Sequence, residues 1–403
     1  MIKSISDFNF KNQRTLLRVD YNVPFNDDGT IADDTRIVAT LPTINKIIKD
    51  GGIPIIMSHL GRPKGEKNPK YSLAPVAKYL QEKLNFKVKF ANDCIGNETV
   101  ELTKSATVGE IVLLENVRFY AQEEKNDETF SAELAKNGDV YVNDAFGAAH
   151  RSHSSVDGIT KFFKDKFAGF LMNKEVEYLG NSLQNPKKPF VAIIGGAKIS
   201  GKIDVINHLL DKCDTVLIGG GMAFTFYKAM GLNIGSSLLE EDKISLASEI
   251  MDKAKDLNIS SSGASLILPT DAKIADKFDN NANTKTVKYT EIPDSWMGLD
   301  IGEDTVKKYT EIIKNAKTVI WNGPMGVSEM PNFEYGTKSV AFALVDATAN
   351  GATTIIGGGD SAAAINQFGL ADKVSHVSTG GGASLEFLEG KKLPGVVALS
   401  IKN

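Results

Sequence analysis

The sequence predicts an α/β protein of two similar-sized domains, each a parallel sheet covered by helices in the doubly wound, Rossmann-like manner. Short apolar runs rich in β-branched residues recur along the chain, and stretches with helical spacing separate them. Strands that are apolar at nearly every position are typical of parallel sheets buried on both faces. A length of 403 residues exceeds what one ordinary core supports and favours two domains.

Nine runs are expected to form strands. In the first half they are TLLRVDYNV (15–23), GIPIIMSH (52–59), IVLLENV (111–117) and VYVNDAF (140–146). In the second half they are PFVAIIGG (189–196), TVLIGGG (215–221), SLILPTD (265–271), TVIWNGP (318–324) and TTIIGGG (353–359).

The spacers between these runs predict helices, because their apolar residues recur with helical spacing. The clearest cases are APVAKYLQEKL (74–84), NHLLDKC (207–213) and GTKSVAFALVDATA (336–349). A further helix-like stretch, NKEVEYLGNSL (173–183), runs into the breaker QNPKKP (184–189), and this junction is the expected division between the domains.

Composition excludes several classes of protein. A net charge of -4 argues against wholesale binding of nucleic acid or membrane surfaces. No apolar run reaches the roughly 18 residues of a membrane span, and the first residues lack the apolar core of a secretory signal, so a cytosolic protein is expected. Cys94 and Cys213 form no C-x-x-C pair and are expected to be apolar filler.

In the second half, almost every expected strand ends in glycine or a polar residue. These residues are Gly195 and Gly196, residues 219–221, Asp271, Asn322 and Gly323, residues 357–360, and residues 379–382. Ligands of open α/β sheets bind outside the carboxyl ends of the strands, so these loops are expected to share one rim and one site.

The first half places a different chemistry at its strand ends. Its expected rim carries Asp20, Asn22, His59, Arg62, Arg118, His150 and Arg151, with Arg36 soon after the first strand. Arginine binds carboxylate and phosphate in a planar, bidentate manner, so several arginines on one rim predict a small ligand that bears both groups.

Residues 196–202 spell all but the last letter of a P-loop, but Ile203 stands where Ser or Thr would ligate Mg²⁺. The glycines and the two lysines, Lys198 and Lys202, still suit nucleotide phosphates. Asp360, after three glycines at a strand end, is expected to supply the hard oxygen ligand instead. Residues 379–382 precede the helix-like ASLEFLEG (383–390) and offer backbone N–H groups to phosphate. This inventory predicts phosphoryl transfer, which depends on positioning and positive charge.

Eleven motifs together identify the chain as similar to the phosphoglycerate kinase family, in the family's order and along essentially the whole chain. They are RVDYNVPF, DDTRIVATLPTI, SHLGRP, LLENVRFY, NDAFGAAHRSH, GGAKISGKI, IGGGMAFTF, MGLDIG, WNGPMGVSE, GGGDS and STGGGASLEFLEG. The family's reaction is reversible transfer of a phosphoryl group between 1,3-bisphosphoglycerate and ADP, which gives 3-phosphoglycerate and MgATP.

The resemblance implies a role for each site residue. Phosphoglycerate would contact the first domain through Asp20, Asn22, Arg36, His59, Arg62, Arg118 and Arg151. The transferring group would face Arg36, Lys198 and the glycines Gly380 and Gly381. The nucleotide would contact Lys198, Lys202, Gly219, Gly220, Gly298, Asn322, Glu329, Gly358, Gly359, Asp360 and Ser361, and Asp360 would take the Mg²⁺.

The resemblance also implies a hinge-bending monomer in which the C-terminal segment returns to the first domain. The implied domains are 1–172 with 389–403 for phosphoglycerate and 189–388 for the nucleotide, joined by a hinge at 173–188. Gly201, Ser361 and Glu303 depart from the family's usual aspartate, threonine and proline.

Two other functions remain open from the residues. A P-loop ATPase would need a metal ligand at or near Ile203. A two-domain anion-binding protein would close on phosphoglycerate without turnover of a nucleotide.

Overall fold

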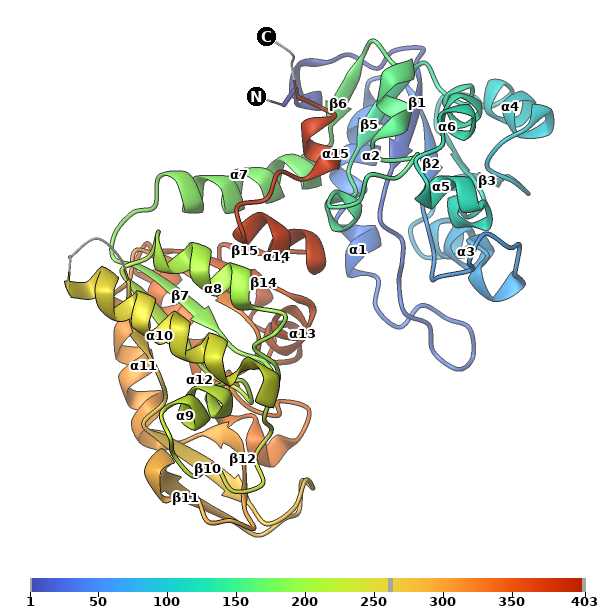
Figure 1. Ribbon diagram of the computed structural model, residues 1–403. Helices are drawn as coiled ribbons and strands as arrows, with labels where there is room; N and C mark the ends of the chain where they lie inside the picture. Colours follow the sequence, from blue (N-terminus) through green and yellow to red (C-terminus); the bar gives the residue numbers. More distant parts are fainter. Residues whose placement is uncertain (1, 260–263, 401–403) are drawn as a thin grey trace. The chain divides into compact units, whose positions relative to one another are not determined.

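The computed structural model describes residues 2–259 and 264–400 (Figure 1). The chain divides into two compact units, unit 1 with Met1–Glu177 and Lys392–Asn403, and unit 2 with Tyr178–Lys391. Each unit carries a six-stranded parallel sheet flanked by helices, which confirms the predicted fold class.

The sheet of unit 1 has the strand order β3-β4-β2-β1-β5-β6, and every pair is parallel. Its strands are β1 (Arg14–Arg18), β2 (Ile53–Met57), β3 (Lys87–Phe90), β4 (Glu110–Leu113), β5 (Val140–Asn143) and β6 (Lys166–Ala168). Its helices are α1 (Thr35–Val38), α2 (Leu41–Lys49), α3 (Ala74–Glu82), α4 (Asn97–Lys104), α5 (Ala121–Glu124), α6 (Glu128–Ala135) and α15 (Pro394–Val397). The four strands expected from the sequence, β1, β2, β4 and β5, are neighbours in this sheet. The apolar run of each is buried.

Helix α2 shows how the local sequence positions an element of unit 1. Its residues Ile44 and Ile47 lie on one face, at helical spacing, and both are buried in the core. Helix α6 begins after Asp127, whose carboxylate accepts the Phe130 N–H at 2.8 Å and so satisfies a backbone donor of the first turn.

Helix α7 (Phe170–Gln184) contains the boundary between the units and covers most of the sequence expected to form the hinge. Residues after Lys392 belong to unit 1, where the Gly395 N–H donates to Ala149 O at 2.8 Å and Ile2 forms an antiparallel bridge with Ser400.

The large sheet of unit 2 has the order β15-β14-β13-β7-β8-β9 and is also entirely parallel. Its strands are β7 (Phe190–Ile194), β8 (Thr215–Ile218), β9 (Ser265–Ile267), β13 (Thr318–Asn322), β14 (Thr353–Gly357) and β15 (His376–Val377). Its helices are α8 (Ile203–Leu210), α9 (Ala223–Ala229), α10 (Ile244–Ile259), α11 (Glu303–Asn315), α12 (Tyr335–Ala349), α13 (Gly359–Gln367) and α14 (Gly382–Leu388). Trp321 of β13 and Tyr309 of α11 are fully buried in one hydrophobic cluster of this unit.

Unit 2 also contains a three-stranded antiparallel sheet that the sequence analysis did not predict. It has the order β11-β10-β12, with β10 (Asp271–Ala275), β11 (Thr284–Lys288) and β12 (Met297–Ile301). The expectation that Asp271 ends a parallel strand is therefore wrong. Asp271 begins β10, and its carboxylate accepts the Thr305 N–H at 2.9 Å in the first turn of α11.

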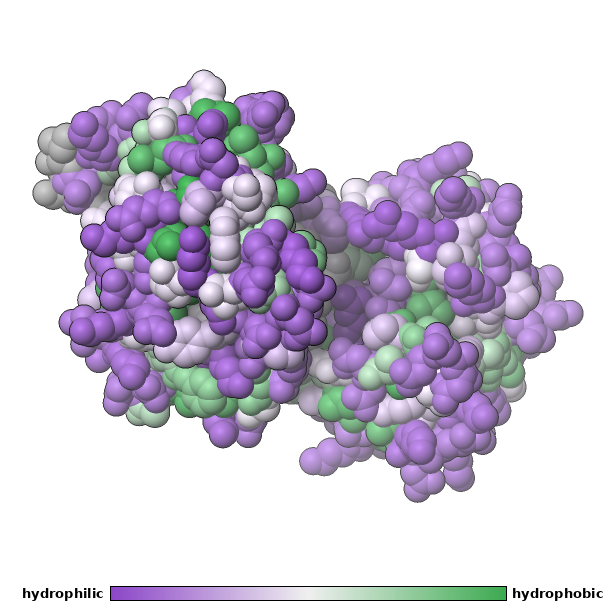
Figure 2. Space-filling view, turned by 90° about the horizontal axis from the view of Figure 1, so that it is seen from below, coloured by the Kyte–Doolittle hydropathy of each residue, from purple (hydrophilic) through white to green (hydrophobic). Residues whose placement is uncertain are grey.

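The surface is polar on the face drawn in Figure 2, where apolar side chains form small separate groups among hydrophilic ones. Among the described residues, no helix combines the length and the apolar character that crossing a bilayer requires.

Candidate active site

The glycine-rich loops of unit 2 meet at the carboxyl edge of its large sheet. The parallel strands β7, β8, β13 and β14 all end there. The Gly196 N–H donates to Pro324 O at 2.9 Å, and the Gly220 N–H donates to Met325 O at 3.0 Å. A Cβ atom at Gly195 would lie 2.2 Å from Pro324 O, and one at Gly220 would lie 2.5 Å from Gly196 O. Only glycine allows these loops to approach so closely.

A cavity of about 670 Å³ opens beside these loops. Its wall includes the apolar side chains of Phe224, Leu238, Phe278, Met297, Val327 and Met330. The residues of the predicted nucleotide site that line it are Gly220, Gly298, Glu329 and Asp360. A Cβ atom at Gly298 would lie 2.0 Å from Cζ of Phe224, so only glycine fits against the Phe224 ring at this position. Such a slot, apolar with a few polar groups at its edge, suits a planar base.

Two nitrogen donors lie together at the end of β13. The Lys202 ammonium contacts Oδ1 of Asn322, and the Nδ2 of Asn322 is buried without a hydrogen-bond partner. Burial lowers the pKa of Lys202 to about 8, and the Asp360 carboxylate partly opposes this shift. A buried amide donor without a partner beside a desolvated ammonium is an arrangement that an anion would satisfy. Lys198, in the same loop as Lys202, has an exposed side chain.

Two residues of the predicted nucleotide site, Gly219 and Ser361, and one residue predicted to face the transferring group, Gly380, lie behind the surface formed by the cavity and Lys202. Gly219 and Gly380 are buried and Gly219 does not line the cavity. Ser361 is fully buried, and its Oγ accepts the Gly323 N–H at 2.6 Å. Ser361 therefore supports the loop after β13.

The remaining glycines of the site lie at helix starts. Gly358, with φ of +86°, precedes α13, and a Cβ atom there would lie 3.1 Å from Nδ2 of Asn322. Gly359 is exposed as the first residue of α13, and Gly381 precedes α14 with φ of +43°. Positive φ favours glycine at Gly358 and Gly381.

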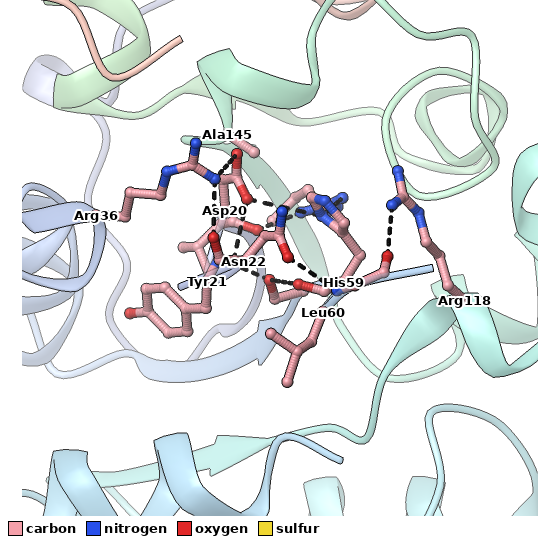
Figure 3. A network of polar contacts seen from close by, with 12 residues as sticks. Asp20, Tyr21, Asn22, Arg36, His59, Leu60, Arg118 and Ala145 are labelled. Carbon is pink, nitrogen blue, oxygen red and sulfur yellow. Dashed lines mark hydrogen bonds and ion pairs between the residues drawn. The ribbon is translucent and has the colours of Figure 1, made fainter. Parts of the chain in front are cut away.

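In unit 1, the carboxyl ends of β1, β2, β4 and β5 carry the residues that we call the arginine rim: Asp20, Asn22, Arg36, His59, Arg62, Arg118 and Arg151. Figure 3 shows part of this rim as a connected network of polar contacts. Nη1 of Arg36 donates to Oδ2 of Asp20 and to the carbonyl oxygen of Asn22, both at 3.1 Å. Oδ1 of Asn22 accepts the Gly61 N–H at 2.8 Å, and Nη1 of Arg118 donates to Gly61 O at 2.9 Å. Arg62 is exposed, and Arg151 is half-buried.

The rim is positively charged at neutral pH. Burial and the neighbouring guanidinium groups of Arg151 and Arg18 lower the pKa of Arg118 to about 10, so it stays charged. Burial is the main cause that lowers the pKa of His59 well below its usual value, and the charges of nearby arginines add to this effect, so the ring is neutral. The rim therefore offers fixed guanidinium charges and an uncharged imidazole to an anionic ligand.

Known proteins match both the sequence and the fold of this chain. A sequence profile of the phosphoglycerate kinase family matches residues 5–391. A phosphoglycerate kinase of Chloroherpeton thalassium is 56% identical over 398 residues, with 99% of each chain covered. The chain belongs to the phosphoglycerate kinase family.

Further members of the phosphoglycerate kinase family agree. The cytosolic phosphoglycerate kinase 3 of Arabidopsis thaliana is 55% identical and covers 99% of this chain and 98% of its own. The solved phosphoglycerate kinase of Coxiella burnetii superposes with a TM-score of 0.87 at 40% identity, covering 99% of this chain and 98% of that one. The predicted family and its phosphotransferase function are confirmed, and an anion-binding protein without turnover is not favoured.

Two features of this phosphoglycerate kinase fold went unnoticed in the sequence, the apolar wall of the cavity and a buried arginine. The apolar wall of the cavity comes from five separate places in the chain, and no local pattern links Phe224 to Met330. Arg18 is fully buried beneath the arginine rim, where its Nη2 lies 3.2 Å from Nδ1 of His59. One signal could have revealed it, because an arginine inside the apolar run TLLRV has to find polar partners in the interior.

Asp300, at the cavity wall, gives a prediction on stability. Its carboxylate accepts the Gly336 N–H at 2.8 Å and the Ile301 N–H at 2.9 Å, and burial raises its pKa to about 7. A raised pKa in the folded state means that the contribution of Asp300 to stability is present below pH 4 and is lost as the pH rises to about 7.

We expect the difference in free energy of unfolding between the wild type and Asp300→Asn to fall over this pH range, by at most about 4 kcal/mol. Urea titrations at pH 4.5, 6 and 7.5 measure it. The exposed Asp252→Asn serves as the control, and a difference that does not change with pH would contradict the prediction.

Proposed function

We propose that the arginine rim of unit 1 binds 3-phosphoglycerate or 1,3-bisphosphoglycerate and that the cavity of unit 2 binds ADP or ATP. The observation that carries this assignment is the contrast between the two rims, since the guanidinium groups gather in unit 1 and the glycine loops with their cavity in unit 2. A coupled assay tests it directly, because ADP-dependent consumption of 1,3-bisphosphoglycerate is expected. Phosphoglycerate binding without that turnover would favour the anion-binding alternative.

In unit 1, the guanidinium groups of Arg62, Arg118 and Arg151 hold the phosphate and carboxylate of phosphoglycerate. Asp20 and Asn22 accept the substrate hydroxyl and fix Arg36, which is already paired with both of them. Arg36 then presents its other N–H groups to the transferring phosphoryl group. This role follows from charge, because a guanidinium stabilises the negative oxygens of that group without changing its own protonation.

In unit 2, the apolar wall of the cavity holds the base beside Gly220 and Gly298, and Glu329 lies at the ribose. Lys202, Asn322 and the backbone N–H groups of Gly358 and Gly359 hold the nucleotide phosphates. Lys198 stabilises the charge of the moving phosphoryl group, together with the N–H of Gly381. Gly380, whose N–H donates to Ser378 Oγ at 3.1 Å, supports this loop from behind.

Mg²⁺ fits this site as part of the nucleotide. Within residues 2–259 and 264–400, no group of three or more His, Cys, Asp or Glu residues could hold a metal ion by itself. Mg²⁺ is usually held by one or two carboxylates, substrate phosphates and water, and the exposed Asp360 at the cavity wall supplies one such carboxylate. The bound ion would neutralise charge on the phosphates.

No general base is required of the protein. In the direction of ATP use, the acceptor is the carboxylate of 3-phosphoglycerate, which is ionised at pH 7 because carboxylic acids of this kind titrate near pH 3.5. The residues of the chain bind the two substrates, orient the reacting groups and exclude water. Since the two substrates bind to different units, we infer that the enzyme closes by bending within 173–188 and opens to release its products.

The environment of the enzyme is also part of this proposal. We infer a monomer in the cytoplasm that acts in glycolysis and gluconeogenesis and needs neither nucleic acid nor a membrane. The Arabidopsis thaliana relatives include both cytosolic and chloroplastic phosphoglycerate kinases.

Arg62 separates substrate binding from catalysis. We expect Arg62→Ala to raise KM for 3-phosphoglycerate about 10- to 100-fold, because one charge-assisted contact is worth about 1.5 to 3 kcal/mol, and to leave KM for ATP within about twofold. Initial rates with each substrate varied in turn measure both constants. The control is Arg14→Ala, because Arg14 is the first residue of β1 and so lies at the edge of the sheet opposite to the arginine rim. An unchanged KM for 3-phosphoglycerate in Arg62→Ala would count against the assignment.

A further inference from the structure

A chain of buried polar groups lies beneath the arginine rim of unit 1. Arg18, the last residue of β1, and Glu123, in helix α5, are both completely buried. Ser155 lies between them, where its Oγ accepts from Nε of Arg18 at 2.8 Å and donates to Oε1 of Glu123 at 2.5 Å. At the other end of the guanidinium, Nη2 of Arg18 lies 3.2 Å from Nδ1 of His59. Glu123 is thus connected to His59 through two side chains.

Glu123 supplies the negative charge that balances the buried Arg18. Burial raises the pKa of Glu123, while Arg18 and the hydrogen bonds from Ser155 oppose this shift. The carboxylate accepts both the hydroxyl and the N–H of Ser155, the latter at 2.8 Å, which is the acceptor-only behaviour of the ionised form. The other basic group near it, Nδ1 of His153 at 3.9 Å, belongs to a ring whose pKa is lowered to about 3 by burial and nearby arginines. His153 is therefore neutral at pH 7 and does not balance Glu123.

The contact between Arg18 and His59 determines which ring nitrogen carries the proton. A guanidinium has only donors, so Nδ1 of His59 has to be the acceptor and carries no hydrogen. The single proton of the neutral ring is then on Nε2. Oδ1 of Asp20 lies 3.8 Å from the same Nδ1, and a carboxylate there would favour the opposite arrangement, with the proton on Nδ1. The ring therefore lies between two neighbours that favour different tautomers.

We propose that Glu123 is a positioning residue for the phosphoglycerate site, because through Ser155 and Arg18 it holds the His59 ring with its proton on Nε2. The inference rests on the proposed function, in which the arginine rim, with His59 as one of its members, binds phosphoglycerate. The substrate's phosphate and carboxylate oxygens are acceptors, so a ring that has to bind them needs an N–H donor at the nitrogen that Arg18 does not occupy. Without the negative charge of Glu123, Arg18 keeps its contact with the carbonyl oxygen of Val19 but loses the balancing charge that Ser155 connects to it, and Asp20 draws the proton to Nδ1.

Histidine nitrogen resonances test the first part of the inference without any substrate. The chain has only five histidines, and loss of one signal set in His59→Gln assigns that residue. In a long-range ¹H–¹⁵N correlation at pH 7.5, the wild type should show an unprotonated Nδ1 and a protonated Nε2 for His59. Glu123→Gln should shift the ring toward the Nδ1–H form or the doubly protonated form.

Three further variants locate the effect. Ser155→Ala removes the hydroxyl between Glu123 and Arg18 and should produce the same change in the His59 tautomer. The double variant Glu123→Gln with Ser155→Ala should change the tautomer no more than either single substitution, because both interrupt the same chain of hydrogen bonds. Glu128→Gln, the same change at an exposed position of the neighbouring helix α6, should leave the His59 signals unaltered. Thermal unfolding of each variant shows that it is folded under the conditions of the measurement.

Steady-state kinetics test the second part. Glu123→Gln and Ser155→Ala should each raise KM for 3-phosphoglycerate about tenfold and change KM for ATP by less than about twofold, as expected for residues that orient a binding group. An unchanged His59 tautomer in both folded variants overturns the inference and leaves the proposed function intact. A changed tautomer with an unchanged KM for 3-phosphoglycerate overturns it as well, and it also contradicts the binding role given to His59. A lower unfolding temperature with neither change assigns Glu123 to stability alone.

Discussion

Lys198→Ala is expected to lower kcat about 10²- to 10³-fold, the effect of removing one group that stabilises developing charge in a transition state. Both KM values should stay within about threefold. Lys198 is exposed in the glycine loop after β7, so it is free to reach the moving phosphoryl group and is not required for folding. A side chain that binds the transition state more strongly than the ground state changes kcat far more than KM.

The control is Lys212→Ala, which removes an exposed lysine just after helix α8 in the same unit. It should keep wild-type values of kcat and KM. Rates measured in both directions of the reaction, with Mg²⁺ in excess, distinguish the outcomes. A Lys198→Ala effect confined to KM would refute the role in the transition state and assign this lysine to ground-state binding.

Asp360→Ala should reduce kcat/KM for the nucleotide about 100-fold or more, because interactions with a catalytic metal ion are worth several kcal/mol. Activity should recover in part at higher Mg²⁺ concentration, since the carboxylate contributes to the affinity for MgADP and MgATP. The measurement is the dependence of the rate on free Mg²⁺ at fixed nucleotide. Wild-type turnover in Asp360→Ala would contradict the assignment of the metal ligand.

Two control variants accompany this experiment. Asp372→Ala removes an exposed carboxylate from the short helix that follows α13, and we expect no change in the Mg²⁺ dependence. Ile203→Val tests the P-loop alternative at the first residue of α8, and it should be close to neutral. A large loss of metal dependence in Ile203→Val would restore that alternative.

The parallel sheets and the rims could be predicted from the sequence because their signals are local. Continuous apolar runs specify buried parallel strands, and a polar or glycine residue at the end of such a run lies at the carboxyl edge by geometry alone. Gly195, Gly220 and Asn322 come together for this reason. Arg36 and Asp20 were both expected at the rim, but their ion pair depends on the turn between β1 and α1.

The remaining features depend on contacts that no local pattern encodes. The strand β10 follows Pro269 within a run that looks continuous, so the change from the parallel sheet to the antiparallel one is not visible in the residues. The hydroxyl of Ser361 is held by the N–H of Gly323, which is 38 residues earlier. Glu123 and Ser155 look like ordinary surface residues, and only their approach to Arg18 reveals a function.

The contact between the two ends of unit 1 has a consequence for biosynthesis. Residues 392–400 pack into unit 1, where Leu393 and Leu399 are almost fully buried and Ser400 pairs with Ile2. The ribosome adds these residues after the whole of unit 2, so residues 178–391 can complete their fold while unit 1 still lacks its final segment. The part of the polypeptide that is synthesised first can therefore complete its fold only after the rest of the chain has been made.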